Sequence, residues 1–401
     1  MNKNIKLAVA GAVLALSASA NAGIVIPAGD WTVDIGGNMN AFYTNTRFTG
    51  DLEAAGVPNN ANTVQTGLLP SAFGIGAKTR QNDLDVAFQF SFFTGVDQGT
   101  GGSAGNNTLN IRQAFLSFGD KSWGQFKLGR DLGVFGSDAI LADMTLLGVG
   151  TAAGAGGNST LGRIGSGYMY ADWVGQIQYQ TPNFSGFQVT AAVVEPHTNT
   201  PSLASNEYGS NSAIRHNMGY QAKATYDFAA NDITGRVWLG GIYQKQQQST
   251  STGGFWNTSD DYNSRAVEIG GKAQAGNFGL VGYYYDGDGI SGSRTALNGL
   301  NYRFGAKSDD TGGYVQATYT LPSKTKLGVS AGESRSKYQG YEFKNESWIV
   351  GAYHPLTKHL NIVAEYTDQK LVNFETSVGA YNDLNLTGKA KTVSLGAILF
   401  F

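Results

Sequence analysis

Apolar and polar residues alternate along most of this chain, and this period of two restricts the possible folds more than any other feature. Between Asn217 and Phe228, apolar side chains occupy every second position, and the positions between them are polar except for Gly219. Such a strand has one apolar and one polar face. About sixteen runs of this kind follow one another, most of them near the roughly 9–11 residues that cross a bilayer obliquely. The pattern therefore predicts an all-β chain of about sixteen antiparallel strands.

The connections between these runs alternate between short and long. Short turns on one side and long loops on the other are typical of a transmembrane β-barrel, and a soluble β-sandwich gives no reason for such sorting. An even number of strands returns the chain to its starting side and lets the sheet close, so that no unpaired edge meets lipid. Short turns are predicted at 81–83, 181–186, 229–232, 276–277, 321–324 and 355–359, and long loops near 48–66, 94–107, 195–215, 244–262, 287–312, 335–345 and 367–389.

The composition agrees with a barrel that has a wet interior. The chain has 56 glycines and no cysteine, and only 14% of its 401 residues are charged. Its mean hydropathy of −0.21 fits such a barrel, in which apolar residues are spread over alternate positions of many strands instead of being gathered in one core. Without disulfides, the rigidity of the chain must come from backbone hydrogen bonding and packing.

The first 22 residues have the pattern of a secretory signal peptide. Lys3 and Lys6 give a basic start, residues 7–16 an apolar core, and residues 20–22 a small-residue cleavage site. A membrane anchor is the weaker interpretation, because the apolar run is short and no stop-transfer pattern follows it. We expect cleavage after residue 22, which leaves residues 23–401 as one barrel domain.

The net charge of the mature chain is mild. Without Lys3 and Lys6, 26 of the 28 Lys and Arg residues remain against 30 Asp and Glu residues, a net charge of −4. This balance gives no reason to expect nucleic acid or an acidic substrate as a partner. Beyond the signal peptide, no stretch has the roughly 18 consecutive apolar residues of a transmembrane helix.

The strand alternation stops between Arg130 and Tyr168. This stretch mixes acids with apolar residues such as Phe135 and Leu146. A loop of this length in an ordered chain is usually functional. Its composition suits a segment that packs against protein on one side and faces water on the other. We expect it to fold into the lumen of the barrel and to narrow a pore there.

Aromatic residues favour the ends of the alternating runs. Rings at both membrane interfaces would form the girdles that fix the depth of a barrel in the bilayer. The predicted girdle residues are Tyr43, Trp173, Tyr179, Tyr283, Tyr284, Tyr285, Tyr319, Tyr353, Tyr366, Phe400 and Phe401.

Three segments of the chain carry a family resemblance. Residues 110–118 (NIRQAFLSF) and 123–130 (WGQFKLGR) resemble strands that precede an inward-folded third loop. Residues 353–360 (YHPLTKHL) resemble a late periplasmic turn, and the terminal residues 399–401 (LFF) resemble the aromatic end that the barrel-insertion machinery recognises. In this order, behind a signal peptide, the segments resemble the trimeric general porins of the Gram-negative outer membrane, which are sixteen-stranded barrels.

This resemblance implies a multi-pass outer-membrane protein that forms a homotrimer and contacts the lipid bilayer and lipopolysaccharide. The second loop, here 94–107, would latch onto a neighbouring subunit. The family also sets a ladder of wall arginines opposite acids of the third loop. Ala72 stands where enteric members carry one of these arginines, and Lys78 and Arg80, on the inward face of the same strand, are expected to compensate. The predicted constriction residues are Arg112, Arg163, Lys78, Arg80, Asp131, Asp138 and Asp143.

A channel of this kind sorts solutes by width and by electric field. Fixed cations on the wall facing fixed anions on the loop create a transverse field, which admits small polar solutes and penalises apolar ones. The predicted function is passive diffusion of small hydrophilic solutes and ions. The alternative is a substrate-selective channel, for example for small carboxylates that bind Arg112 and Arg163.

Enzyme interpretations have little support in the sequence. Residues 101–105 match the G-x-S-x-G nucleophile pattern around Ser103, but they lie in a glycine-rich loop and not between a strand and a helix. The four histidines lack metal-ligand spacing, and zinc ligands from cysteine are absent. We expect no enzyme activity, no cofactor and no nucleic-acid partner. An outer-membrane enzyme or adhesin is a third hypothesis without positive evidence.

Overall fold

The computed structural model describes residues 23–54, 59–96, 109–152, 159–196, 217–246, 262–293, 301–302, 308–338, 341–373 and 386–401. The predicted signal peptide at 1–22 lies outside the described residues. So do most of the predicted second loop at 94–107 and the G-x-S-x-G match around Ser103.

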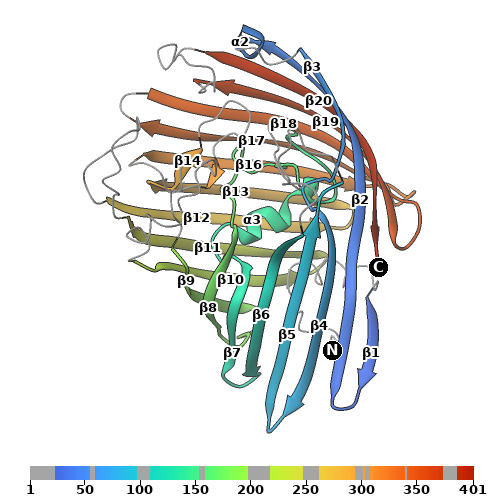
Figure 1. The fold of residues 1–401 in the computed structure, drawn as a ribbon, viewed down its shortest axis with the longest axis vertical. Coiled ribbons are helices and arrows are strands. Elements are labelled where there is room, and N and C mark those ends of the chain that lie inside the picture. Colours follow the sequence, from blue (N-terminus) through green and yellow to red (C-terminus); the bar gives the residue numbers. More distant parts are fainter. Residues whose placement is uncertain are drawn as a thin grey trace.

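Most of the described chain is β-strand, and every strand of the main sheet pairs antiparallel with its neighbours (Figure 1). The strands of the first half are β1 (Ile24–Ala28), β2 (Trp31–Gly50), β3 (Asn60–Gln65), β4 (Ser71–Gln81), β5 (Leu84–Thr94), β6 (Asn110–Asp120), β7 (Gly124–Leu132), β8 (Trp173–Gln180) and β9 (Phe187–Val194). Those of the second half are β10 (Gly219–Ala230), β11 (Ile233–Gln246), β12 (Tyr262–Ala275), β13 (Phe278–Asp288), β16 (Asp309–Thr320), β17 (Lys326–Tyr338), β18 (Tyr341–Pro355), β19 (Leu360–Val372) and β20 (Thr387–Phe400). A separate short hairpin consists of β14 (Ser291–Ser293) and β15 (Asn301–Tyr302).

The sheet closes on itself through its first and last strands. β20 pairs with the second part of β2, from Asn38 to Gly50, while β1 pairs with the first part of β2. Between these two partners, Gly37 and Phe401 exchange backbone hydrogen bonds of 2.8 and 3.1 Å. β20 and β1 therefore share one position of the barrel, and β3 and β4 share another because both pair with β2. The described strands form a closed barrel of sixteen positions, which confirms the predicted strand number.

The six short turns predicted from the sequence all fall between paired neighbouring strands. Asn82 and Asp83, between β4 and β5, both have positive φ angles, 47° and 63°. This is the geometry of a type I′ hairpin turn, which Asn and Asp tolerate better than other non-glycine residues. The local sequence therefore dictates both the position and the type of this turn.

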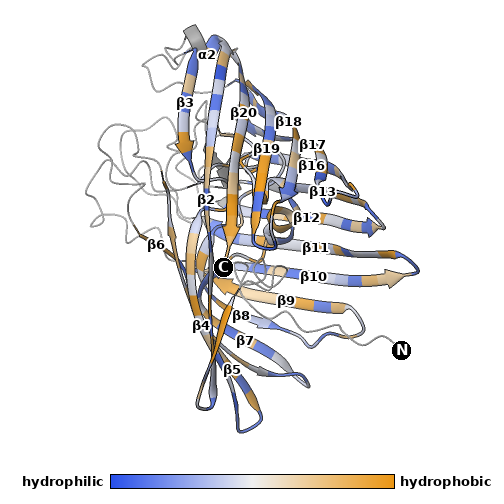
Figure 2. Cartoon of the chain, turned by 90° about the vertical axis from the view of Figure 1, so that its right-hand side faces the viewer, coloured by the Kyte–Doolittle hydropathy of each residue, from blue (hydrophilic) through white to orange (hydrophobic). Residues whose placement is uncertain are grey.

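The apolar faces of the strands point out of the barrel. Leu239, Val267, Ile269, Val315 and Leu395 each expose more than half of their surface. Along the same strands the residues between them are mostly buried and polar, and Figure 2 shows the resulting alternation of hydropathy. An apolar exterior over a whole closed sheet is the surface that a membrane β-barrel presents to lipid.

Several predicted girdle aromatics lie inside the barrel instead. Tyr283, Tyr285 and Tyr353 are at most 5% exposed and face inward. Of the three neighbouring tyrosines, only Tyr284 faces outward, because adjacent residues of a strand point to opposite faces. The girdle prediction was wrong for these inward rings. Tyr43, which is 49% exposed, has the predicted outward orientation.

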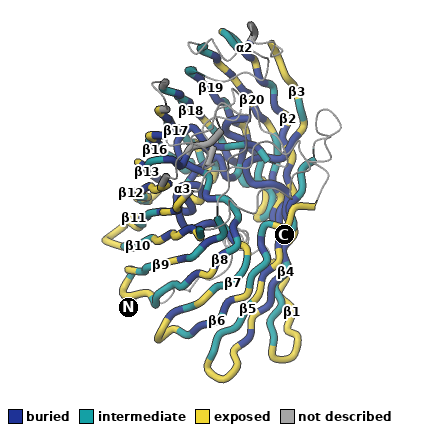
Figure 3. Tube along the Cα trace, turned by 60° about the vertical axis from the view of Figure 1, so that its left-hand side comes forward, coloured by how far each residue is buried: buried dark blue, intermediate teal, exposed yellow. Residues whose placement is uncertain are grey.

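The described helices are short. α2 (Asp51–Ala54) follows β2, while α3 (Ser137–Ala142) and the 3-10 helix η1 (Met144–Leu147) lie between β7 and β8. None of them has the length and apolar character that a membrane-crossing helix needs. Figure 1 shows α3 within the ring of strands, and Figure 3 shows how much of the surrounding wall is buried.

Candidate functional site

The segment between β7 and β8, residues 133–172, is bonded to the inner face of the wall. Gln221 of β10 accepts hydrogen bonds from the backbone N–H groups of Val134 and Phe135, at 2.7 and 2.9 Å. Glu268 of β12 accepts one from the N–H of Gly136 at 2.9 Å. These two wall side chains fix the start of α3.

Two further wall side chains fix the middle of the same segment. Gln316 of β16 accepts a hydrogen bond from the N–H of Met144 (2.7 Å) and donates one to the carbonyl of Ala142 (3.0 Å). Glu365 of β19 accepts hydrogen bonds from the N–H groups of Val149 and Gly150, both at 2.8 Å. Segment 133–172 is therefore hydrogen-bonded to strands from β10 to β19, all on the inner face of the barrel.

The same segment buries an apolar surface against the wall. Phe135, Ala139 and Ile140 of α3 and its approach belong to one buried hydrophobic cluster with inward residues of many strands. Burial of this surface favours the observed position of the segment through the hydrophobic effect. The wall members of the cluster include Phe42, Trp238, Ile349, Val363 and Ile398.

Asp138 lies at the centre of a charged cluster between α3 and the wall. Its carboxylate is 2.5 Å from Lys223 Nζ of β10 and 3.1 Å from Arg236 Nη1 of β11. Arg236 also forms two hydrogen bonds with Asp227, at 2.6 and 2.7 Å. Burial acts to raise the pKa of the Asp138 carboxyl, but Lys223 and Arg236 outweigh it and hold the pKa at about 2. Asp138 is therefore an anion at neutral pH, and its charge is matched by two wall cations.

Arg163 lies in the segment itself and not on a barrel strand. Its side chain is fully buried and donates to Ser330 of β17, to Ser347 of β18 and to the carbonyl of Ser166. Burial lowers the pKa of the Arg163 guanidinium. The prediction of a water-facing arginine at this position is therefore corrected: Arg163 attaches the segment to the wall.

Asp143 is also buried, and it caps a helix within the segment. It is the N-cap of η1, where its carboxylate accepts a hydrogen bond of 2.9 Å from the N–H of Thr145. The hydroxyl of Tyr168 donates to its other oxygen at 2.8 Å. At 4% exposure, Asp143 stabilises the fold of the segment and has little contact with water.

Asp131 stands at the end of β7, where the segment begins. It pairs with Lys127, four residues earlier on the same strand, and accepts a hydrogen bond of 2.8 Å from Gln113 of β6. Gln113 in turn accepts a hydrogen bond from Ser91 of β5. Asp131 is thus a buried member of a polar network on the wall, away from the charged cluster of Asp138.

The remaining predicted cations are spread over the barrel. Arg112 stands at a β-bulge at the start of β6 and lies 5.1 Å from the ring centre of Phe93. Lys78 is 3.2 Å from Asp34, and Arg80 is 2.9 Å from both Asp85 and Asp120 near the short turns. The structure therefore does not bring the seven predicted residues into one ring.

The sequence analysis missed the wall residues that contact the segment. Lys223 and Asp227 stand on the polar side of the alternating run 217–228, so their inward orientation could be predicted. Which inward residue meets α3 depends on contacts between distant parts of the chain, and the pattern carries no such information. The missed residues are Gln221, Lys223, Arg236, Glu268, Gln316 and Glu365.

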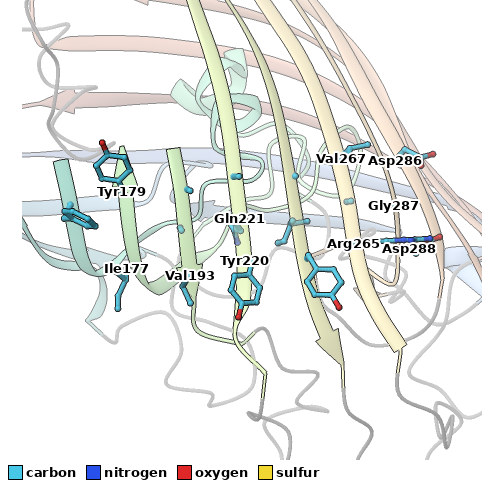
Figure 4. A pocket seen from close by; sticks show the side chains of 18 residues that line it. Ile177, Tyr179, Val193, Tyr220, Gln221, Arg265, Val267, Asp286, Gly287 and Asp288 are labelled. Atoms are coloured by element: carbon cyan, nitrogen blue, oxygen red, sulfur yellow. The ribbon is translucent and has the colours of Figure 1, made fainter. Parts of the chain in front are cut away.

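A hollow of about 910 Å³ lies on the outer face of β8 to β13 and is separate from this cluster (Figure 4). Small residues such as Ala191, Ala222 and Gly241 leave it open, and Tyr220 stands at its edge. Arg265 and Asp288 form an ion pair of 2.7 Å there. Within the described ranges, no three His, Asp or Glu side chains are grouped to hold a metal ion.

Known proteins share this architecture. A model of the Gram-negative porin family matches residues 7–373 of the chain. The chain is similar to the anion-selective porin from Comamonas acidovorans, with 15% sequence identity over 92% of this chain and 100% of that one and a TM-score of 0.62. No curated protein sequence matches the chain significantly.

Two further solved structures are similar in fold. OmpF of Salmonella typhi, in complex with daunomycin, has 16% identity over 94% of this chain and 100% of that one, with a TM-score of 0.60. The trimer form of in-vitro folded OmpT from Vibrio cholerae has 15% identity over 92% and 99% of the two chains, with a TM-score of 0.56. The family match, together with the closed apolar-outside barrel, shows that the chain belongs to the Gram-negative porins, which are outer-membrane channels and not enzymes.

Proposed function

We propose that the channel admits small hydrophilic solutes and ions by passive diffusion and that segment 133–172 sets its size limit. The observation that carries this proposal is the set of bonds from the segment to Gln221, Glu268, Gln316 and Glu365. Because these residues stand on β10, β12, β16 and β19 of a closed barrel, a segment bonded to all of them spans part of the lumen. A segment so placed reduces the open cross-section.

We also propose that charge filtering takes place beside α3. Asp138 on the segment faces Lys223 and Arg236 on the wall. Lys272 of β12 stands directly opposite Arg236 in the β11–β12 ladder and is exposed. Wall cations facing a segment anion produce the transverse field that orders water and penalises apolar solutes. Among the predicted residues, Asp138 has the strongest support for this role, and Arg112, Lys78 and Arg80 contribute cations elsewhere along the wall.

Size filtering is tested by liposome swelling with sugars of increasing size, together with conductance in planar bilayers. Replacement of residues 137–147 by a short glycine linker should raise both the conductance and the size limit. Arg265→Gln, on the outer face, is the matched control and should change neither. A protein that inserts but passes neither ions nor sugars would contradict the channel proposal.

Substrate selectivity for small carboxylates remains the alternative. The exposed Lys272 beside Arg236 supports it, since a carboxylate could be drawn to this pair of like charges. Saturable block of the ion current by one carboxylate favours this alternative. Equal conductance in its presence and absence favours general diffusion.

We further propose that the chain forms a homotrimer in contact with lipid and lipopolysaccharide, after removal of residues 1–22. The trimer form of OmpT supports the oligomeric state by analogy of fold. Cross-linking in native outer membranes tests the trimer, and intact-mass measurement of the purified protein tests the cleavage site.

A further inference from the structure

Three buried polar atoms of the inner wall, on neighbouring strands, have no hydrogen-bond partner within the described part of the chain. They are Nε2 of Gln221 on β10, Nε1 of Trp238 on β11 and Oε1 of Glu268 on β12. Their residues are 3%, 2% and 1% exposed, so bulk water does not reach them. A buried polar group without a partner costs stability, and native proteins usually satisfy such a group with protein or with ordered water.

The contacts of Gln221 with the segment fix the orientation of its amide. Its Oε1 accepts hydrogen bonds from the N–H groups of Val134 and Phe135. Only the oxygen of an amide side chain can accept, so Nε2 has to point away from these two groups. The next N–H group along the chain, that of Gly136, donates to Oε2 of Glu268. The unpartnered atoms of Gln221 and Glu268 therefore belong to side chains that bind successive peptide groups.

Trp238 and Glu268 lean across each other on neighbouring strands. Trp238 lies opposite Gly270, where a Cβ atom would be 2.3 Å from Cε2, the ring carbon bonded to Nε1. Glu268 lies opposite Gly240, where a Cβ atom would be 2.6 Å from Oε1 of the carboxylate. The hydroxyl of Tyr283 donates to Glu268 at 2.8 Å, and its ring centre lies 6.4 Å from that of Trp238. The unpartnered atoms of both side chains therefore lie in the same part of the wall, over glycines that leave room.

The hydrogen-bonding character of the three atoms determines which ligand they fit. Nε2 of Gln221 and Nε1 of Trp238 can only donate, whereas a carboxylate oxygen of Glu268 accepts. Oε2 of Glu268 already accepts two hydrogen bonds, and such bonds favour the ionised form of the group. The ligand therefore has to accept two hydrogen bonds and donate one, as water does. A cation would meet two donors, and an anion would meet the carboxylate.

We propose that one buried water molecule binds between Gln221, Trp238 and Glu268 and completes the attachment of α3 to the wall. The water accepts hydrogen bonds from Gln221 and Trp238 and donates one to Glu268, and about three such bonds are usual for a buried water. It connects three neighbouring strands at the point where Gln221 and Glu268 hold the start of the segment. The inference concerns this attachment and does not depend on which solutes the channel admits.

A high-resolution crystal structure of the wild-type protein, grown at slightly alkaline pH, tests this inference directly. We expect one peak of electron density at about 2.7–3.2 Å from each of the three atoms. The absence of such a peak would overturn the proposal. Crystals soaked in sodium bromide separate water from an anion, because bromide gives an anomalous signal. A bromide peak between the three atoms of the wild type would also overturn the proposal.

Glu268→Gln changes the chemistry of the site and nearly keeps its shape. The N–H of Gly136 and the hydroxyl of Tyr283 still require the oxygen of the new amide, so its NH₂ group takes the place of the acceptor. Three donors then face one point without a negative charge, and water accepts at most two hydrogen bonds. We expect the water peak to be lost in this variant and a bromide peak to appear in soaked crystals. An unchanged water peak would contradict the assigned roles.

Trp238→Phe removes one donor and keeps an aromatic ring at the same place. We expect the water peak to be lost or displaced in this variant. Trp348→Phe is the matched control, because Trp348 lies on the outer face and is 44% exposed, and it should keep the peak. Equal water density in the two variants would show that the indole N–H does not bind the water, and this result would overturn the proposal.

A measurement in solution keeps the inference testable if a variant does not crystallise. In detergent-solubilised protein, the indole N–H of Trp238 should show a nuclear Overhauser effect to a long-lived water. The chain has six tryptophans, and the signal of Trp238 is the one that Trp238→Phe removes. The absence of this effect at Trp238 would overturn the proposal. Absence of conductance in the wild type would refute the channel proposal and leave the result for the water site intact.

Discussion

Glu365, on β19, accepts a hydrogen bond of 2.8 Å from the backbone N–H of Val149, although the two residues are separated by 216 positions in the chain. Glu268 on β12 has the same relationship to Gly136, at 2.9 Å. Each carboxylate is also a hydrogen-bond acceptor for a buried tyrosine hydroxyl, from Tyr353 at 2.6 Å and from Tyr283 at 2.8 Å. Two acids of the wall thus hold two points of the segment that contains α3 and η1.

Removal of the Glu365 side chain should loosen this segment. Glu365→Ala leaves the N–H groups of Val149 and Gly150 and the hydroxyl of Tyr353 without their acceptor in a buried site. We expect a loss of about 3 kcal/mol of stability and a noisier, larger single-channel current, because unsatisfied buried donors are costly. Thermal unfolding and planar-bilayer recordings measure the two effects. Glu365→Gln keeps one acceptor oxygen and should have a smaller effect; equal effects of both variants would contradict this role.

Arg163→Ala should affect stability more than ion selectivity. The variant removes the hydrogen bonds to Ser330, Ser347 and Ser166 and leaves a cavity in a fully buried position. We expect a loss of about 3 kcal/mol or more, measured by thermal unfolding. The reversal potential in a salt gradient should stay close to the wild-type value in the protein that remains folded. A large shift towards cations would instead place Arg163 at the water-filled narrow zone.

Asp138→Asn should move ion preference towards anions. The substitution removes one negative charge and leaves Lys223 and Arg236 without that partner at the edge of the lumen. Lys223→Gln should move the preference in the opposite direction, and the reversal potential measures both. Asp143→Asn is the matched control, since Asp143 is buried as a helix cap, and it should shift the potential little. No shift from Asp138→Asn would remove Asp138 from the charge filter.

The Asp138 ion pairs should lose their contribution to stability only in strong acid. The pKa of this carboxyl is about 2 in the folded protein, against an ordinary value of 3.8. A lowered pKa means that the contribution, about 2 kcal/mol, is complete above about pH 4 and disappears as the pH falls towards 2. Thermal unfolding of the wild type and of Asp138→Asn should therefore differ at pH 6 and converge near pH 2. A difference that already disappears at pH 5 would contradict the strength of these ion pairs.

The strands and turns of this protein could be predicted because their signals are local. The alternation in a run such as 217–228 fixes which face of a strand is apolar, and Asn82 with Asp83 fixes a turn. Tyr283 and Tyr353 were wrongly predicted as girdle residues, because a place near the end of a run does not show on which face of the strand a ring lies. Inside the barrel, Glu268 and Glu365 accept hydrogen bonds from the hydroxyl groups of Tyr283 and Tyr353, which satisfies these buried groups.

The candidate site could be predicted only in part. Asp138 was singled out as a segment acid, and the structure gives it two wall cations. Lys223 and Arg236 were missed because nothing in their own strands indicates which distant residue they meet. Arg163 was predicted as a constriction residue, but its burial follows from contacts with Ser330 and Ser347, far along the chain. Contacts across the lumen are non-local, and a periodic pattern does not encode them.

The shared position of β20 and β1, with Gly37 bonded to Phe401 between them, means that the ring has a single seam made from the two extremes of the polypeptide. The barrel cannot close before β20 has been synthesised, because β20 is the strand that pairs with β2. Until β20 pairs with β2, the sheet keeps two unpaired edges, and such edges favour aggregation.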